Sequence, residues 1–252
     1  MDHHQSLRAG LGAAMDGADT PLAAADRLCT ACVDLLEVDG ASISLLDGGA
    51  SRGTFGSSDD FGRLLDELQF TYGEGPCVDA VLEGQPVIAA DLADPDELRW
   101  PVLRSELLHR GVRAVFALPV TISAQRVGAL DLYRRRSGAL SQRSLGGGLL
   151  AAELAALPLL DLMHSDVDWA AAAQGGDHWE QLASLERVEV YQATGMIMAA
   201  FDVSSVEALV RLRARAFALG QTASELAWAV VERRTPLGPD GWSAPSGPGG
   251  LR

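Results

Sequence analysis

The chain has 252 residues, a formal net charge of −14 and a pI near 4.7. An acidic chain of this kind is a poor candidate for a general DNA coat or for a protein that binds anionic membranes. Its length suggests about two domains. No run of about 18 uninterrupted apolar residues appears, and the N-terminus leads into no apolar stretch, so we expect neither a membrane span nor a signal peptide. Three cysteines argue against a disulfide scaffold, and a cytoplasmic location is expected.

After an N-terminal segment, 1–19, helix and strand signals alternate over 20–163. Thr20 followed by Pro21 is a helix start, because the hydroxyl caps the first turn and proline suits the first helical position. The further predicted elements are a helix to about Leu36, a strand at 41–47, a polar turn at 56–60, a short strand at 87–90, a helix at 97–109, strands at 114–122 and 126–133, and a helix at 141–163 with Pro158 as a candidate kink. The last two strands form a hairpin. Helices flanking a mostly antiparallel sheet predict an α+β, sensor-like domain.

Several strings in this first domain are distinctive. They are Phe70-Thr71-Tyr72-Gly73-Glu74-Gly75-Pro76-Cys77, Pro86-Val87-Ile88, Arg99-Trp100-Pro101, 111–119 and Leu130-Asp131-Leu132-Tyr133. With them the segment resembles a GAF domain, and most closely the GAF domains that precede ANTAR domains in actinobacterial regulators. Members bind small molecules or serve as dimerising sensors, so the resemblance implies a small-molecule or protein signal.

The resemblance also implies a pocket between the sheet and the loops above it. The candidate lining residues are Phe55, Phe61, Tyr72, Cys77, Trp100 and Phe116. Each of them also suits a plain core position, because large aromatic side chains dominate core burial. The turn at Gly73, Gly75 and Pro76 is a candidate for presenting backbone N–H groups to an anion.

Candidate chemistry in this domain is sparse. Cys29 and Cys32 have C-x-x-C spacing but lie within a predicted amphipathic helix, which favours buried structural thiols. An alternative is a Cys-dependent GAF redox enzyme, such as a reductase of free methionine sulfoxide, that uses Cys77. His109 is a candidate axial haem ligand. We expect no enzyme activity, no metal site and no cofactor.

Three short helices in series are predicted after a linker at 164–176. Ser204 and Thr222 each stand three positions before a Glu, which predicts a capping box at the start of the second and third helices. Apolar residues recur at helical spacing: Val190, Ala193, Ile197 and Ala200, then Leu209, Leu212, Ala216 and Leu219, then Ala223, Leu226, Val230 and Val231. Short helices are unstable alone, so we expect a bundle. The Pro- and Gly-rich tail, 238–252, is predicted to be disordered.

These helices contain a second distinctive pattern: the string Gln192-Ala193-Thr194-Gly195-Met196-Ile197-Met198, then Glu207-Ala208, Leu212-Arg213, Ala216 and Val230-Val231. Over 177–237 the chain resembles the ANTAR domain, a three-helix RNA-binding module. Members act as transcription antiterminators by holding a two-stem-loop RNA. The resemblance implies RNA contacts from Gln192, Ala193, Thr194, Gly195, Arg211, Arg213, Arg215 and Trp228. The arginines would contact phosphate or loop bases, and Ala193 and Gly195 would permit close approach.

The sequence departs from the family pattern at two positions. Thr194 stands where many members have Lys, which removes one phosphate contact. Trp228 stands where a small residue is usual, and it is suited either to stacking on an unpaired base or to packing on another protein surface. The segment 177–237 has eight acidic residues and six arginines, a net charge of −2, so RNA contacts would need local clusters of arginine.

The combined pattern predicts a signal-responsive antitermination regulator. Its GAF domain would sense a signal, and two ANTAR bundles of a homodimer would bind tandem RNA stem-loops in nascent transcripts. Alternatives are the redox enzyme above and a regulator whose bundle only dimerises or binds protein.

Overall fold

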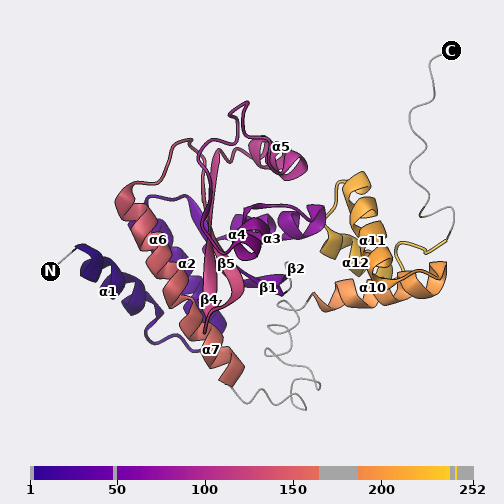
Figure 1. The fold of residues 1–252 in the computed structure, drawn as a ribbon. Helices are drawn as coiled ribbons and strands as arrows, with labels where there is room; N and C mark the ends of the chain where they lie inside the picture. Colours follow the sequence, from indigo (N-terminus) through magenta and orange to yellow (C-terminus); the bar gives the residue numbers. More distant parts are fainter. Residues whose placement is uncertain (1–2, 48–49, 165–186, 239–241, 243–252) are drawn as a thin grey trace. The chain divides into compact units, whose positions relative to one another are not determined.

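The computed structural model describes residues 3–47, 50–164, 187–238 and Trp242. These residues form two compact units (Figure 1). The first contains the sheet and α1 to α7 apart from Phe70–Tyr72 at the end of α3, and the second contains Phe70–Tyr72 and α10 to α12. The predicted linker beyond residue 164 and most of the predicted tail lie outside the described residues.

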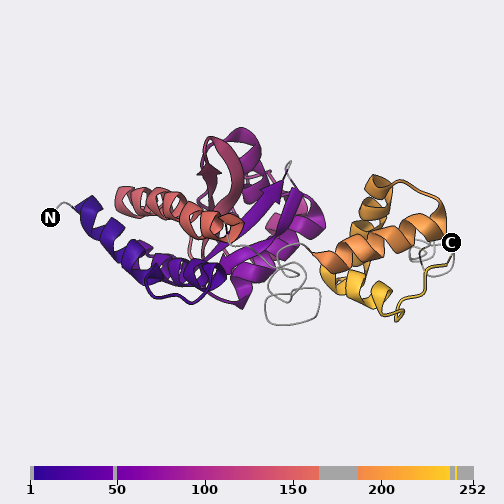
Figure 2. The same cartoon turned by 90° about the horizontal axis from the view of Figure 1, so that it is seen from below.

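The first unit is built on a five-stranded sheet of order β2-β1-β5-β4-β3, in which every neighbouring pair is antiparallel. In chain order its elements are α1 (His3–Met15), α2 (Pro21–Leu36), β1 (Gly40–Asp47), β2 (Ala50–Ser57), α3 (Asp60–Tyr72), α4 (Pro76–Glu83), β3 (Val87–Ala89), α5 (Pro101–His109), β4 (Ala114–Ile122), β5 (Gln125–Arg134), α6 (Gln142–Leu154) and α7 (Ala156–His164). Helices α2 and α6 pack on one face of the sheet, and α3 and α4 cover the other (Figures 1 and 2). This arrangement confirms the predicted α+β class.

The two faces of the sheet differ in chemistry. The face under α2 and α6 is apolar, and its strand residues are Ala41, Ile43, Phe55, Ala114, Phe116, Leu118, Val120, Leu130 and Leu132. Side chains alternate between faces along a strand, so Ala129 and Asp131 point the other way, towards α3 and α4. A charged residue therefore lies in the middle of the sheet on that second face.

Most predicted elements are present, and three differ for identifiable reasons. The helix expected over 97–109 begins only at Pro101, because Trp100 has a left-handed backbone with φ of 50°. The closing helix breaks at Ala155 and not at Pro158, because a proline ring clashes with the carbonyl four residues earlier. The polar turn at 56–60 instead contains the end of β2 and the start of α3. Helices α1, α3 and α4 and strand β2 were not predicted from the sequence.

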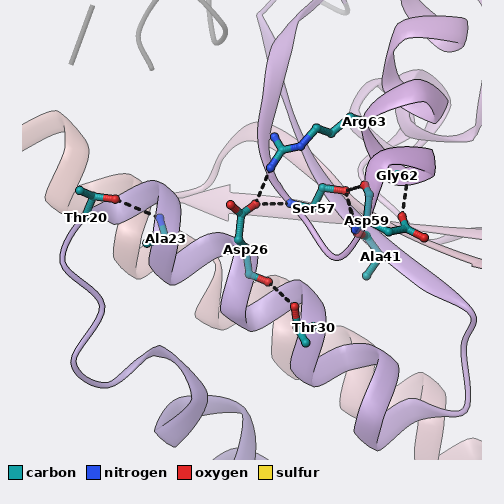
Figure 3. Close-up of polar contacts among 9 residues, drawn as sticks. All are labelled: Thr20, Ala23, Asp26, Thr30, Ala41, Ser57, Asp59, Gly62 and Arg63. Atoms are coloured by element: carbon teal, nitrogen blue, oxygen red, sulfur yellow. Dashed lines mark hydrogen bonds and ion pairs between the residues drawn. The ribbon is translucent and has the colours of Figure 1, made fainter. Parts of the chain in front are cut away.

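A polar network fixes the start of α3 against α2 (Figure 3). Oδ1 of Asp26 accepts the backbone N–H of Ser57 at 2.7 Å and Nη2 of Arg63 at 3.0 Å. The Ser57 hydroxyl donates to the carbonyl oxygen of Asp59 at 2.6 Å, and the Asp59 carboxylate caps α3 by accepting the N–H of Gly62 at 2.8 Å. The network sets the position at which α3 begins its passage over the second face of the sheet.

One stretch of this unit, Gln142–Leu162, is long and apolar enough to cross a membrane. However, 56% of its apolar window is buried inside the protein, and α6 packs on α2 and β4. Helices α10 and α11 pass the same test only if taken together, and they bend by 106° at their junction. The packing of 142–162 is that of a core helix.

The second unit is an all-helical bundle of α10 (Val188–Phe201), α11 (Ser205–Leu219) and α12 (Ala223–Val231). Its buried core includes Val190, Ala193, Ile197, Ala208, Leu212, Ala216, Ala223, Leu226, Ala227 and Val230. Ala200 and Leu219, which were expected on the buried stripes, are exposed near the ends of their helices. The capping box is complete at Thr222 and Glu225. At Ser204 only the hydroxyl half forms, because Glu207 instead accepts Nη2 of Arg211 at 2.6 Å.

Gly128 of β5 has no room for a side chain against the backbone of β1. A Cβ at this position would lie 2.1 Å from the carbonyl oxygen of Ser44, a backbone atom held by strand pairing. We expect Gly128→Ala to destabilise the protein by about 2 kcal/mol or more, as overpacking does. Gly146→Ala, in a helix with no atom within 4 Å of the added carbon, should instead stabilise by up to about 1 kcal/mol. Urea denaturation of both variants tests this, and equal effects would contradict the assigned contact.

Candidate functional site: a buried acceptor cluster

Five polar side chains gather, fully buried, where α3 crosses the second face of the sheet. Ser42 and Ser44 come from β1, Asp131 from β5, and Asp66 and Gln69 from α3. Burying polar groups is unfavourable unless each finds a partner. We name these five residues the acceptor cluster, because oxygen atoms dominate it.

Strand pairing places the serines beside Asp131. Ser42 lies directly opposite Asp131 in the β1–β5 pair, and Ser44 lies opposite Ala129, the next residue on the same face of β5. Directly opposed residues have Cβ atoms about 4.5–5.5 Å apart. The two hydroxyls and the carboxylate therefore form one contiguous polar patch.

Gln69 connects this patch to the start of α4. Its Nε2 donates to Oδ2 of Asp131 at 2.7 Å, and its Oε1 accepts the backbone N–H of Cys77 at 2.9 Å. The N-cap residue of α4 is Gly75, which has no side chain to cap the helix. The amide oxygen of Gln69 therefore accepts one of the free N–H groups in the first turn of α4. Gly75 has a φ of 149°, and a Cβ there would lie 2.4 Å from Oε1 of Gln69. The turn at Gly73, Gly75 and Pro76 was a candidate anion site. The backbone N–H of Cys77, which follows this turn, already donates to Gln69.

The neighbouring carboxylate is also held by hydroxyl groups. Oδ1 of Asp66 accepts a hydrogen bond from the Ser51 hydroxyl at 2.8 Å, and Oδ2 accepts one from the Thr54 hydroxyl at 3.0 Å. Both donors are on β2. Asp66 therefore has a hydrogen-bond donor on each carboxylate oxygen. Among the described residues, Asp131 has a hydrogen-bond donor on Oδ2 and none on Oδ1.

Electrostatics in the cluster centre on Asp131. Burial raises the pKa of its carboxyl to about 8; the charge of Asp66 raises this pKa further and the hydrogen bond from Gln69 lowers it. Oδ1 of Asp131 and the Oγ atoms of Ser42 and Ser44 have no hydrogen-bond partner among the described residues. These three buried oxygen atoms belong to one patch, which marks it as the candidate site of the domain.

The first unit matches a known family model. The GAF domain model covers residues 18–157. The chain belongs to the GAF domain family.

Solved GAF structures share the fold at low sequence identity. The GAF domain of a phosphoenolpyruvate-protein phosphotransferase from Coxiella burnetii is 14% identical, with a TM-score of 0.51, over 64% of this chain and 95% of that one. Its counterpart from Acinetobacter is 12% identical, with a TM-score of 0.50, over 65% and 96%. A type II free methionine-R-sulfoxide reductase from Thermoplasma acidophilum is 18% identical, with a TM-score of 0.39, over 64% and 96%. No curated protein sequence matches the chain.

The six residues predicted to line a GAF pocket do not meet at one place. Phe55 and Phe116 belong to the apolar core under α2 and α6, on the opposite face from the acceptor cluster. Phe61 packs against Tyr133 with ring centroids 4.9 Å apart. Tyr72 is partly exposed at the end of α3, and Trp100 donates from Nε1 to Asp79 at 2.8 Å. Of the six, only Cys77 has a hydrogen bond to the cluster among its described contacts.

The acceptor cluster itself was not foreseen. Its signal in the sequence is a polar residue at every second position of an otherwise apolar strand, as at Ser42 and Ser44, and an aspartate between Leu130 and Leu132. Such alternation is also typical of a strand with one solvated face. Only the helices covering this face distinguish the two cases.

The three thiols of the GAF domain are all buried, and Cys29 and Cys32 are neighbours on α2. Cys29 and Cys32 lie on α2 in the apolar core, where burial raises the pKa of Cys29 well above its usual value and that of Cys32 to about 12. Cys77 is buried on α4 over the other face of the sheet. His109 is exposed at the end of α5. Within the described ranges, no group of three or more His, Cys, Asp or Glu side chains could hold a metal.

In the helical unit, the residues expected to contact RNA fall into buried and exposed groups. Ala193 is fully buried and Thr194 nearly so, hence both contribute to packing. Gln192 and Gly195 are exposed on α10, and the Trp228 side chain is 51% exposed on α12. Arg211, Arg213 and Arg215 are partly exposed on α11, and Arg211 is ion-paired with Glu207 at 2.6 Å.

The raised pKa of Asp131 predicts a pH-dependent stability. The pKa of the Asp131 carboxyl is about 8 in the folded protein and about 3.9 in the unfolded chain. The contribution of the protonated carboxyl to the free energy of unfolding is therefore fully present below about pH 4 and is lost as pH rises through 8. Asp131→Asn can still accept from Gln69, and it removes the buried charge. We expect this variant to be more stable than the wild type by on the order of 2 kcal/mol at pH 8, with little difference near pH 4.

Urea denaturation at several pH values between 4 and 8.5 measures this difference. Asp34→Asn, an exposed change on α2, is the matched control and should follow the wild-type profile. A pH profile of Asp131→Asn that is parallel to the wild type would contradict the assignment.

Proposed function

We propose that the chain is a signal-responsive regulator of transcription in the cytoplasm. Its GAF domain binds a small ligand at the acceptor cluster. Its helical unit, 188–231, acts as an ANTAR domain of the actinobacterial type and binds tandem RNA stem-loops in nascent transcripts as a homodimer. The observation that supports sensing is the buried patch of Asp131, Ser42 and Ser44, in which Oδ1 of Asp131 and the two serine Oγ atoms lack hydrogen-bond partners among the described residues.

The RNA-binding half of the proposal is supported by an open surface within the matching sequence string. Gly195 lies in the middle of α10, and no atom is found within 4 Å of the position where its Cβ would be. Glycine in a helix interior costs up to about 1 kcal/mol relative to alanine. A bare backbone on an exposed helix face suits close approach of a nucleic-acid strand, and Gln192 is exposed on the same helix.

A second candidate function rests on a separate surface. Val206, Val210 and Phe217 of α11 are 73%, 57% and 57% exposed, and their spacing puts them on one helical stripe. Exposed apolar stripes mark protein interaction sites. This favours a bundle that dimerises or binds a protein, with or without RNA.

The arginines of α11 are tested together. We expect a variant with Arg211, Arg213 and Arg215 all changed to alanine to bind a synthetic tandem stem-loop RNA at least about tenfold more weakly, with a shallower salt dependence, because phosphate contacts release counterions. Fluorescence anisotropy of the full chain at several salt concentrations measures both effects. Duplex DNA and an RNA with one loop scrambled are the competing ligands, and Arg143→Ala, exposed at the start of α6, is the matched control. Undiminished binding by the triple variant would reject these contacts.

Gly195→Ala tests the approach of RNA to α10. The added carbon meets no protein atom, so the variant should keep or raise its Tm. If RNA passes close to this backbone, its Kd should rise by about tenfold, since a methyl group then displaces the strand. Gly146→Ala on α6 makes the same change away from the bundle and should leave the Kd unaltered. A normal Kd for Gly195→Ala would place the RNA elsewhere.

A further inference from the structure

A tryptophan of the C-terminal tail packs on the helical bundle at the end of α10. Trp242 is partly buried against the bundle core, and the centroid of its ring lies 5.9 Å from that of Phe201, the last residue of α10. The guanidinium of Arg211 on α11 also lies over the Phe201 ring, with Cζ 5.4 Å from the centroid. The Phe201 ring therefore has an indole and a cation as neighbours.

We propose that Phe201 and Arg211 form a stacking site for an unpaired RNA base, and that Trp242 occupies this site in the free protein as an intramolecular competitor. This inference rests on the proposed RNA binding by the helical unit, and it adds Phe201 and Trp242 to the residues at the RNA surface. Proteins hold unpaired bases by stacking them on aromatic side chains and on arginine guanidinium planes. The indole of Trp242 is a flat aromatic ring of the kind that such a site accepts.

The chemistry of the site matches a nucleotide. Arg211 bonds Glu207 through Nη2 at 2.6 Å, and a guanidinium has five N–H donors, so donors beyond this bond remain for a phosphate oxygen or a base edge. The Arg211 side chain is 41% exposed and is therefore accessible to such a group. A cation beside an aromatic ring suits a ligand that combines a flat ring with a negative charge.

Trp242 fits this site imperfectly, as expected of an occupant that RNA can displace. Its Nε1 atom is buried and has no hydrogen-bond acceptor among the described residues. A buried donor without an acceptor is unfavourable. The backbone N–H of Trp242 donates to the carbonyl of Gly238 at 3.1 Å, which is a bond within the tail and not to the bundle. The described contact between the indole and the bundle is therefore one of packing.

A short tether explains how this contact keeps the site filled. Leu237 also packs against the bundle core, and Trp242 follows it by five positions. A connection of this length gives the indole an effective concentration on the order of millimolar at the site. RNA that must displace the indole binds with an intrinsic Kd divided by the open fraction of the protein. A site that is closed for about nine-tenths of the time therefore weakens RNA binding by about tenfold.

Fluorine NMR of the full chain labelled with 5-fluorotryptophan tests the displacement directly in an otherwise unchanged protein. The resonances of Trp242 and Trp100 are assigned from Trp242→Phe and Trp100→Phe. We expect a synthetic tandem stem-loop RNA to move the Trp242 resonance towards its position in the urea-unfolded chain. Trp100, which donates to Asp79 in the GAF domain, should not shift. An unmoved Trp242 resonance in a protein saturated with RNA would overturn the proposal.

RNA anisotropy of variants measures the competition. We expect Trp242→Ala to bind the tandem stem-loop about tenfold more tightly, because the site is then always open. Trp242→Phe retains a ring and is the matched control, with a Kd near that of the wild type. Adding Phe201→Leu to Trp242→Ala removes the flat face but keeps apolar volume, and it should abolish the gain. Thermal unfolding checks that each variant is folded. Equal or weaker binding by folded Trp242→Ala would show that Trp242 only completes the core.

The outcomes distinguish this inference from the proposed function. RNA binding by the wild type without release of Trp242 would reject the competitor and leave antitermination standing. Absence of RNA binding in the wild type and in every variant, even at low salt, would reject both. Tight RNA binding with release of Trp242, lost in the Phe201→Leu background, would support both.

Discussion

The carboxylate of Asp131, buried in the middle of a β-sheet, constrains much of the GAF domain. A charge in that position is unfavourable unless it is neutralised or hydrogen-bonded, and both responses are visible. Burial raises the pKa of Asp131 to about 8, and Gln69 is held within 2.7 Å to donate to one of its oxygens. The position of α3 follows, because Gln69 must cross directly above the β1–β5 pair.

The same constraint organises the loop between α3 and α4. Because the amide oxygen of Gln69 accepts the N–H of Cys77, the chain must turn tightly at Gly75, where any Cβ would collide with that amide. Glu74, in the same turn, accepts the N–H groups of Val102 and Leu103 and so caps α5. Two helix starts and the buried carboxylate thus depend on five consecutive residues, 73–77, and the side chain of Gln69. The distinctive sequence string at 70–77 therefore links the starts of two helices to a buried polar group.

The two units face different physical problems. The GAF domain buries oxygen atoms, and in the proposed sensor a ligand would satisfy them, which would couple ligand binding to folding stability. The helical unit has a small core built largely from alanine and leucine, and it exposes apolar and arginine side chains together on α11. Its net charge gives RNA little long-range attraction, so recognition in the proposed antiterminator would depend on close contacts such as those at Gly195. A regulator with weak intrinsic RNA binding is well placed to be switched by dimerisation or by a ligand elsewhere.

Local signals were sufficient for much of this protein. The Thr20–Pro21 helix start, the 114–134 hairpin and the three C-terminal helices follow from caps, alternation and helical spacing, which act between residues close in sequence. The acceptor cluster draws its residues from β1, α3 and β5, and its Gln69–Asp131 hydrogen bond joins residues 62 positions apart in the chain. No local pattern reveals which face of a strand a helix will cover, so Ser42, Ser44 and Asp131 could equally have faced water, and Phe55 and Phe116 could equally have lined a pocket. The sequence by itself determined many of the elements and the GAF resemblance. The burial of polar atoms, and hence the candidate site, was decided only by tertiary packing, because desolvation depends on what covers a residue and not on its neighbours in the chain.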